Sequence, residues 1–439
     1  MGAIACEWGS ELVFGSVVDG NGGASRNLHV KCIPSDRSET QEIPVPKRVR
    51  LFLFALLLLP TLLLATVLEV GAGEIRRLYP GLAYLARGNA GISYSQDEYA
   101  LFYNPAGLGD AKEFIFVTPF VFEGSQTAFD IAQGKISTSG STSAVAQNLL
   151  GKTIHLRIPY IFKPTTLLNM QLVYPFGKRY SGFTLAALIG GDRTLRIGVS
   201  DAVNLNLTVA DRLEQFTTIG LGMPIFKGQY NIGFSAMQIE RCDKSSTSSV
   251  SGISSGFTSF VNNAVCTTGE MRKGTSFTLG FQQRMTSLQF LRMSWGMSIL
   301  NAGGLKFARN SGETTPQDEK QEVNIGLAMQ PNLGIARTLL LADLRDLTKN
   351  HADDTACKSA GGTTATNCWY KRLHLGLELG FLGDWIILRS GYNQGYPTSG
   401  WELSLPFLPV IRYADYKVET GTPSGVAEQR KAIEFSLEF

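Results

Sequence analysis

Apolar and polar side chains alternate along many segments of this chain, and the last segment shows the pattern most fully. One face of a strand over residues 431–439 would carry four large apolar residues: Ile433, Phe435, Leu437 and Phe439. The other face would carry Ala432, Glu434, Ser436 and Glu438. Such a strand fits the edge of a soluble sandwich, or the closing strand of a transmembrane barrel with lipid outside and water inside.

The same alternation recurs through the chain, for example over residues 203–209, 230–235, 291–299 and 373–381. Repetition of two-faced segments predicts half-buried strands in series. Residues 190–203 fit this pattern poorly, and we assign them to no single strand.

The lengths of the connections separate the two alternatives. Long polar stretches cover residues 124–153, 240–273, 301–322, 349–371 and 419–431. Short turns cover residues 284–289, 330–334 and 382–384. Counted from Phe114, each long stretch follows an odd-numbered strand and most short turns follow an even one, an asymmetry typical of outer-membrane barrels. The sequence therefore predicts an all-β fold, a transmembrane antiparallel β-barrel of about 14–16 strands over residues 113–439.

The N-terminal part has the anatomy of an export signal. Three basic residues, Lys47, Arg48 and Arg50, precede an apolar run over residues 51–68, and small residues at 70–72 follow it. This arrangement predicts a signal peptide over residues 47–72. A transmembrane helix is the alternative, since the run is near the lower spanning length. Residues 1–46 have no pattern, and we interpret them as a leader of doubtful authenticity.

Composition and charge agree with one large barrel. The chain is 44% hydrophobic and 18% charged, and it contains 47 glycines. A formal net charge of +3 is too weak to predict a nucleic-acid partner.

Four of the six cysteines fall within two long polar stretches. Cys242 and Cys266 lie in one stretch, and Cys357 and Cys368 lie in another. Exported proteins meet an oxidising compartment, so we expect these two pairs to form disulfides. A metal site is the rival interpretation, but only one histidine lies nearby and no CxxC spacing occurs.

Motifs for catalysis are poor. The four histidines form no metal-ligand spacing, and the G-x-S-x-G pattern at residues 252–256 lies in a serine-rich loop. A nucleophile elbow needs a strand, a sharp turn and a helix. We therefore predict that the protein is not an enzyme, with no catalytic residue, metal ligand or cofactor.

The most informative motif precedes the first predicted strand. Residues 100–108 read Ala-Leu-Phe-Tyr-Asn-Pro-Ala-Gly-Leu, and Asn-Pro followed by Ala-Gly is strong turn chemistry. This stretch resembles the N-terminal signature of FadL-type outer-membrane transporters and their PorV-like relatives. The resemblance implies that residues 73–112 form a hatch inside the lumen, with Asn104, Pro105 and Ala106 as its turn. An ordinary loop before a strand is the alternative.

The resemblance also implies a function: passive transport of hydrophobic small molecules, such as long-chain fatty acids, across the outer membrane. The predicted inner faces depart from this expectation. A pocket for a hydrophobic ligand should carry apolar groups, whereas the faces opposite the lipid carry Gly, Ser, Asn and Thr. A PorV-like secretion partner, a structural or adhesion barrel at the surface, and a general porin are the alternatives. The expected partners are outer-membrane lipid, a hydrophobic ligand and the barrel assembly machinery, which would read Phe439 as its signal. Ligand-binding residues are not identifiable from the sequence.

Overall fold

The computed structural model describes residues 80–438, apart from residues 112–113, 160–169, 177–181, 201–204, 250–258, 261, 286–289, 309–315, 333, 335, 349–368 and 420–426. The predicted leader, the signal peptide, Phe439, Cys357 and Cys368 therefore lie outside the described residues.

Sixteen strands are present among the described residues. They are β1 (Ile115–Ser125), β2 (Thr153–Pro159), β3 (Met170–Phe176), β4 (Phe183–Ser200), β5 (Asn206–Ile225), β6 (Tyr230–Ser249), β7 (Arg272–Arg284), β8 (Leu291–Leu300), β9 (Lys306–Phe307), β10 (Glu322–Pro331), β11 (Arg337–Leu344), β12 (Leu373–Phe381), β13 (Ile386–Asn393), β14 (Tyr396–Leu403), β15 (Val410–Glu419) and β16 (Ala427–Glu438).

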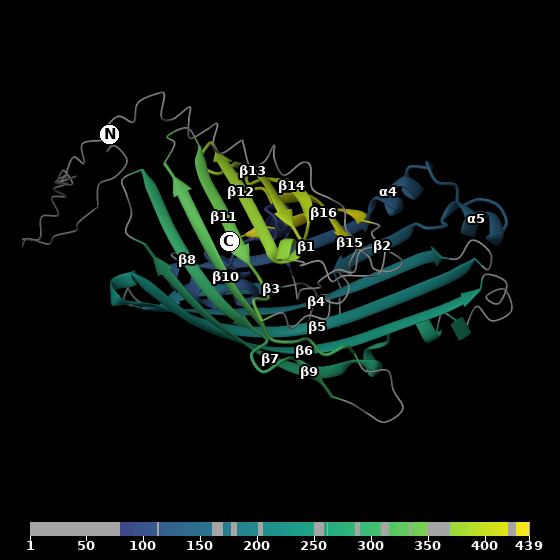
Figure 1. Cartoon of the computed structure of the whole chain (residues 1–439), viewed down its shortest axis with the longest axis horizontal. Coiled ribbons are helices and arrows are strands. Elements are labelled where there is room, and N and C mark those ends of the chain that lie inside the picture. The colour runs from purple at the N-terminus through teal and green to yellow at the C-terminus, as the bar shows by residue number, and fades with distance from the viewer. Residues whose placement is uncertain are drawn as a thin grey trace, which may run out of the picture. The chain divides into compact units, whose positions relative to one another are not determined.

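Antiparallel pairing joins these strands into a closed wall (Figure 1). The last strand pairs with the first, and Phe435 of β16 lies opposite Phe120 of β1. β2 and β3 share one place in the wall, since each pairs with both β1 and β4, whereas β9 pairs only with β7. In the part of the chain that the structure describes, the wall thus has fourteen strand positions. The predicted all-β barrel of about 14–16 strands is confirmed.

The two faces of the wall differ in chemistry. Outward positions carry exposed apolar side chains such as Leu185, Ile219, Phe234 and Phe277. Inward positions between them are small or polar, as at Thr184. Because a closed barrel leaves no unpaired edge, strands with this outer face can cross lipid. The wall thus has the closure and the outer-face chemistry of a multi-pass transmembrane barrel.

Connections of different length gather at opposite ends of the barrel. Short connections gather at one end, which we call the short-turn end: residues 177–182, 226–229, 285–290, 332–336, 382–385 and 404–409. At the other end, the long-loop end, lie the long connections after β1, β6, β8, β11 and β15. Two short connections, residues 201–205 and 394–395, also lie there, and the parity was predicted for most short turns rather than for all of them.

The helices are short. α4 (Gln126–Ala132) and α5 (Thr142–Asn148) follow β1, and their first turns are capped by the hydroxyls of Ser125 and Ser141. α7 (Trp369–Arg372) precedes β12, and the 3-10 turns η3 (Phe226–Gly228) and η4 (Thr268–Glu270) lie in connections. Nowhere in the described residues does a helix have the length and apolar character needed to span a bilayer.

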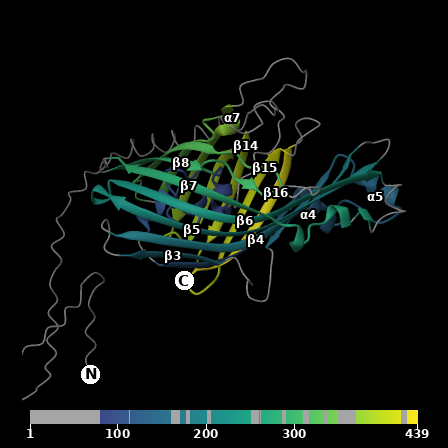
Figure 2. The ribbon, with the colours of Figure 1, turned by 90° about the horizontal axis from the view of Figure 1, so that it is seen from below.

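Residues 80–110 lie inside the ring of strands rather than in its wall, and appear in purple in Figure 2. They form α2 (Leu82–Ala86), α3 (Ala100–Tyr103) and η2 (Pro105–Asp110). α2 contacts β13 to β16, and η2 contacts β4 to β7. Tyr84, Ile92, Leu101 and Leu108 of this N-terminal segment are almost fully buried and belong to the main apolar cluster.

Candidate functional site

The predicted turn at Asn104 is tied to both the N-terminal segment and the wall. The Asn104 amide donates to the carbonyl of Ile92 at 2.7 Å and to that of Phe281, on β7, at 3.0 Å. Its side-chain oxygen accepts the backbone N–H of Ala106 at 3.1 Å, which caps η2. Each polar atom of this buried side chain therefore has a partner.

Inward glycines allow the N-terminal segment to approach the wall closely. A Cβ added at Gly233 would lie 2.2 Å from the carbonyl carbon of Pro105, and one at Gly280 would lie 2.1 Å from Oδ1 of Asn104. At Gly391 it would lie 2.2 Å from the backbone nitrogen of Gly88. The small residues on the inner faces are thus required where the segment packs.

Polar wall residues bind the backbone of the same segment. The carboxylate of Asp343 accepts the N–H groups of Gly91 at 2.7 Å and Ile92 at 3.0 Å. The hydroxyl of Thr398 accepts the N–H of Gly88 at 2.9 Å and donates to the carbonyl of Ala86 at 3.0 Å. Irregular backbone buried at this depth needs such partners, because water does not supply them.

A belt of alternating charges crosses the inward face of β11 to β16. Its members are Arg337, Glu378, Arg389, Glu402, Arg412 and Glu434, joined by successive ion pairs of 2.6–2.9 Å. Arg87 of the N-terminal segment joins the belt at Glu378, at 3.1 Å. On the opposite side, Asp110 of the segment pairs with Arg284 and accepts from Asn231 at 2.6 Å. Ion pairs therefore hold the segment at both of its ends.

Within the segment, Tyr84 donates a hydrogen bond to Asp97 at 2.7 Å. Burial raises the pKa of Tyr84 and also that of Asp97. Tyr84 therefore remains a donor at neutral pH.

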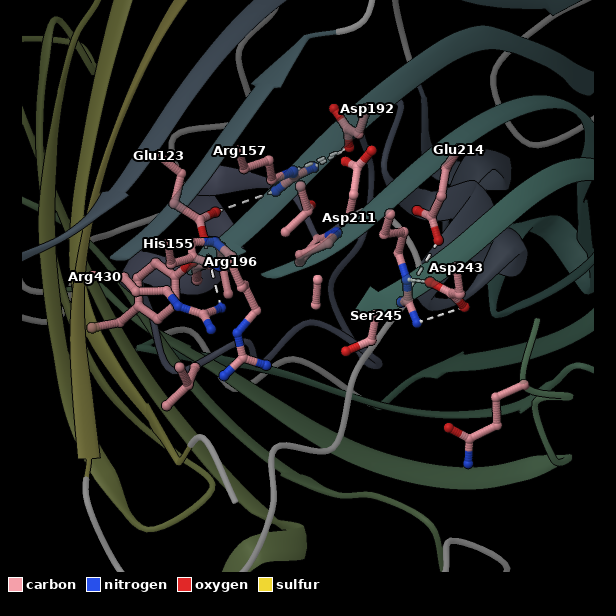
Figure 3. Close-up of a pocket in the computed structure, with 18 of the residues that line it drawn as sticks. Glu123, His155, Arg157, Asp192, Arg196, Asp211, Glu214, Asp243, Ser245 and Arg430 are labelled. Atoms are coloured by element: carbon pink, nitrogen blue, oxygen red, sulfur yellow. Dashed lines mark hydrogen bonds and ion pairs between the residues drawn. The ribbon is translucent and has the colours of Figure 1, made fainter. Parts of the chain in front are cut away.

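A cavity of about 500 Å³ opens between the N-terminal segment and the long-loop end (Figure 3). We call it the long-loop cavity. Pro80, Leu85 and Asn89 of the N-terminal segment contribute to its lining. Its charged lining residues come from β1, β2, β4, β5, β6 and β16: Glu123, His155, Arg157, Asp192, Arg196, Asp211, Arg212, Glu214, Asp243, Lys244 and Arg430.

Most of these charges are paired at short distance. Nε2 of His155 lies 2.8 Å from Glu123, Arg157 lies 2.6 Å from Asp192, and Arg212 lies 2.5 Å from Asp243. Arg196 differs, since its one ion-pair partner within the described residues is Glu428 at 3.9 Å. The side chain of Arg196 is 20% exposed and reaches toward the cavity in Figure 3. It is the cation most available to a ligand.

The long-loop cavity also has an apolar wall. Leu85 of α2 packs with Tyr416 and Val418 of β15 in one buried cluster, and all three line the cavity. The cavity can therefore contact both an apolar and an anionic group of one ligand.

A second cavity, of about 540 Å³, lies at the short-turn end, and we call it the short-turn cavity. Most of the belt of alternating charges lines it, together with Tyr94, Tyr99 and Phe114. Since the N-terminal segment contributes Leu85 to one cavity and Arg87 to the other, it lies between them.

The structure joins Cys242 and Cys266 in a disulfide, as expected from the sequence. The pair packs with Leu213, and the N–H of Cys266 donates to Asp211 at 2.8 Å. Across the described ranges, no group of three or more His, Cys, Asp or Glu side chains is arranged to hold a metal ion.

The sequence did not identify the cavity residues. Arg157 alternates with the exposed Leu156 and Ile158, so its inward position was readable once β2 was recognised. Its partner Asp192 lies in the stretch that we assigned to no strand, and only the strand pairing brings the two together.

No protein-family model matches the chain, and no curated protein matches it. Among solved structures, the toluene transporter TodX of P. putida is 14% identical with a TM-score of 0.43, over 82% of this chain and 98% of that chain. The toluene transporter TbuX of Ralstonia pickettii is 13% identical with a TM-score of 0.44, over 82% and 98%. The CymD monoaromatic hydrocarbon channel is 10% identical with a TM-score of 0.39, over 85% and 99%.

These three proteins belong to the FadL family, which is the family that residues 100–108 resemble. The fold of the present chain rests on its own strand pairing.

Proposed function

We propose that the protein passively transports hydrophobic small molecules across the outer membrane, and that its ligands also carry an anionic group. The observation that carries this proposal is the mixed lining of the long-loop cavity, where Arg196 lies in the same cavity as the apolar wall of Leu85, Tyr416 and Val418. Long-chain fatty acids are the class that fits both features.

Each half of the ligand has a physical reason to bind. The apolar part leaves water for the wall of the cavity. The anionic part forms a charge-assisted hydrogen bond with the guanidinium of Arg196, whose ion pair with Glu428 is long, at 3.9 Å. Displacement of the N-terminal segment, the predicted hatch, then connects the long-loop cavity to the short-turn cavity. Transport along this path needs no covalent step.

Binding of dodecanoate to the purified barrel, measured by titration calorimetry, tests the proposal. Replacing Arg196 by Gln removes the charge, and we expect dodecanoate affinity to fall about 10- to 100-fold, the range for a hydrogen bond to a charged group. Lys152→Gln is the matched control, because Lys152 is an exposed cation outside the cavity, and it should leave the affinity unchanged.

Toluene provides the contrasting ligand, since it has the apolar part alone. We expect Arg196→Gln to leave its binding unchanged. If the intact barrel binds and passes neither ligand, the proposed function is wrong. If it binds toluene but not dodecanoate, transport of hydrophobic compounds stands and the role of Arg196 does not.

A further inference from the structure

Three apolar side chains stand at the tips of the turns at the short-turn end. Phe226, Leu382 and Phe407 are 75%, 71% and 105% exposed, and each lies in a different turn. Each also has a positive φ, of 50°, 54° and 67° respectively. We call these three residues the turn tips.

Both properties are unfavourable for a turn in water. Turns that need a left-handed residue normally use Gly, Asn or Asp, and a bulky residue there is strained. Full exposure of a phenylalanine or leucine to water adds the loss of apolar burial. Observed strain at an exposed position is a reason to look for a function. The loss of apolar burial disappears if the turn tips contact an apolar environment instead of water.

The turn tips are distributed around the barrel rather than gathered in one patch. They connect β5 to β6, β12 to β13 and β14 to β15, and Phe290 is half exposed in the turn between β7 and β8. A protein partner would cover one contiguous patch. A membrane surface encircles a barrel and meets all of these turns at one level.

The turn tips also continue the lipid-facing surface. Met223, three residues before Phe226, is an exposed outward residue, and Trp385 and Ile386 are exposed after Leu382. Lys227 and Arg292 are exposed beside Phe226 and Phe290. Aromatic and basic side chains together are typical of the boundary between lipid and water.

We propose that Phe226, Leu382 and Phe407 insert into the interfacial layer of the membrane leaflet at the short-turn end, and so fix the depth of the barrel. In outer-membrane barrels the short turns face the periplasm, so this leaflet is the phospholipid one. The occupant of the surface is the headgroup and upper acyl region of phospholipids.

Fluorescence quenching in phospholipid nanodiscs of phosphatidylcholine and phosphatidylglycerol tests this placement. Phe407→Trp adds a reporter at a turn tip, and its emission is taken as the difference from the parent chain. We expect quenching by lipids brominated near the glycerol end of their acyl chains, and weak quenching by iodide in water. Gly269→Trp, where a side chain meets nothing within 4 Å, reports on a connection at the long-loop end and should be quenched at least twofold more by iodide.

Leu382→Trp provides a second reporter if Phe407→Trp does not fold. Iodide quenching at both turn tips that equals quenching at Gly269→Trp would overturn the proposal, because the tips would then lie in water. Shielding from iodide without quenching by brominated lipid would also overturn it, since protein rather than lipid would then cover the tips. Neither result depends on which ligand the barrel transports.

Discussion

Inward glycines decide how closely the N-terminal segment can approach the wall. At Gly391 an added Cβ would meet backbone atoms of Gly88 and Arg87 at 2.2 and 2.4 Å, and backbone cannot rotate away as a side-chain end can. At Gly198, also in a strand, the nearest atom would be Oγ1 of Thr153 at 3.7 Å, which is ordinary contact. A Gly-to-Ala change lowers the conformational entropy of the unfolded chain at both positions. The two positions therefore differ only in the packing around the added Cβ.

We expect Gly391→Ala to lower the free energy of unfolding by about 1–3 kcal/mol, the usual cost of overpacking. Gly198→Ala should change it by less than about 0.5 kcal/mol. Urea titrations of the refolded barrel in detergent micelles, followed by tryptophan fluorescence, measure both. Equal effects of the two substitutions would show that the N-terminal segment does not pack as described.

At the scale of single residues, the sequence predicted turns better than ion pairs. Asn and Pro favour turns through the side-chain hydrogen bonds of Asn and the fixed φ of Pro, so Asn104 and Pro105 predict a turn locally. In the structure, η2 begins at Pro105. The pairing of Arg157 with Asp192, or of Arg87 with Glu378, depends on strand register between residues far apart in sequence. No local pattern contains that information.

At the scale of elements, the two-residue period predicted most of the wall because outward residues are apolar wherever a strand crosses lipid. β4 was missed in part for a physical reason. Its residues 190–196 extend to the long-loop cavity, where Asp192 and Arg196 face inward and Arg193 pairs with Asp211. The apolar face disappears there, although the backbone pairing continues to Ser200.

The disulfide belongs to this scale, because it joins Cys242, within β6, to Cys266 in the connection that follows that strand. Cys242 and Cys266 are 24 residues apart, and a loop of this length is stabilised by about 3 kcal/mol in the chain-entropy model. We expect the double change Cys242→Ser and Cys266→Ser to raise hydrogen exchange in residues 262–271 at least tenfold. Exchange in β12 to β16 should not change, since those strands keep their ladder and ion pairs. Faster exchange throughout the barrel would contradict this local role.

For the whole molecule, the central question is whether the lumen is closed at rest. The N-terminal segment lies between two cavities and is held by Asp343 and Thr398 through four hydrogen bonds to its backbone. A closed lumen predicts that the intact protein shows no large, steady conductance in a planar lipid bilayer. A general porin, the alternative left open by the small polar residues of the inner faces, predicts the opposite.

The double change Asp343→Ala and Thr398→Val removes these hydrogen bonds and leaves buried N–H groups without partners. Each such loss costs about 1–3 kcal/mol, so the open fraction should rise at least about tenfold. Thr208→Val, which removes an exposed hydroxyl pair with Thr247 outside the segment, is the control and should leave the current unchanged. Single-channel recordings of the three proteins measure this. Steady conductance in the intact chain, unchanged by the double substitution, would mean that solutes pass beside the segment and that it does not act as a plug.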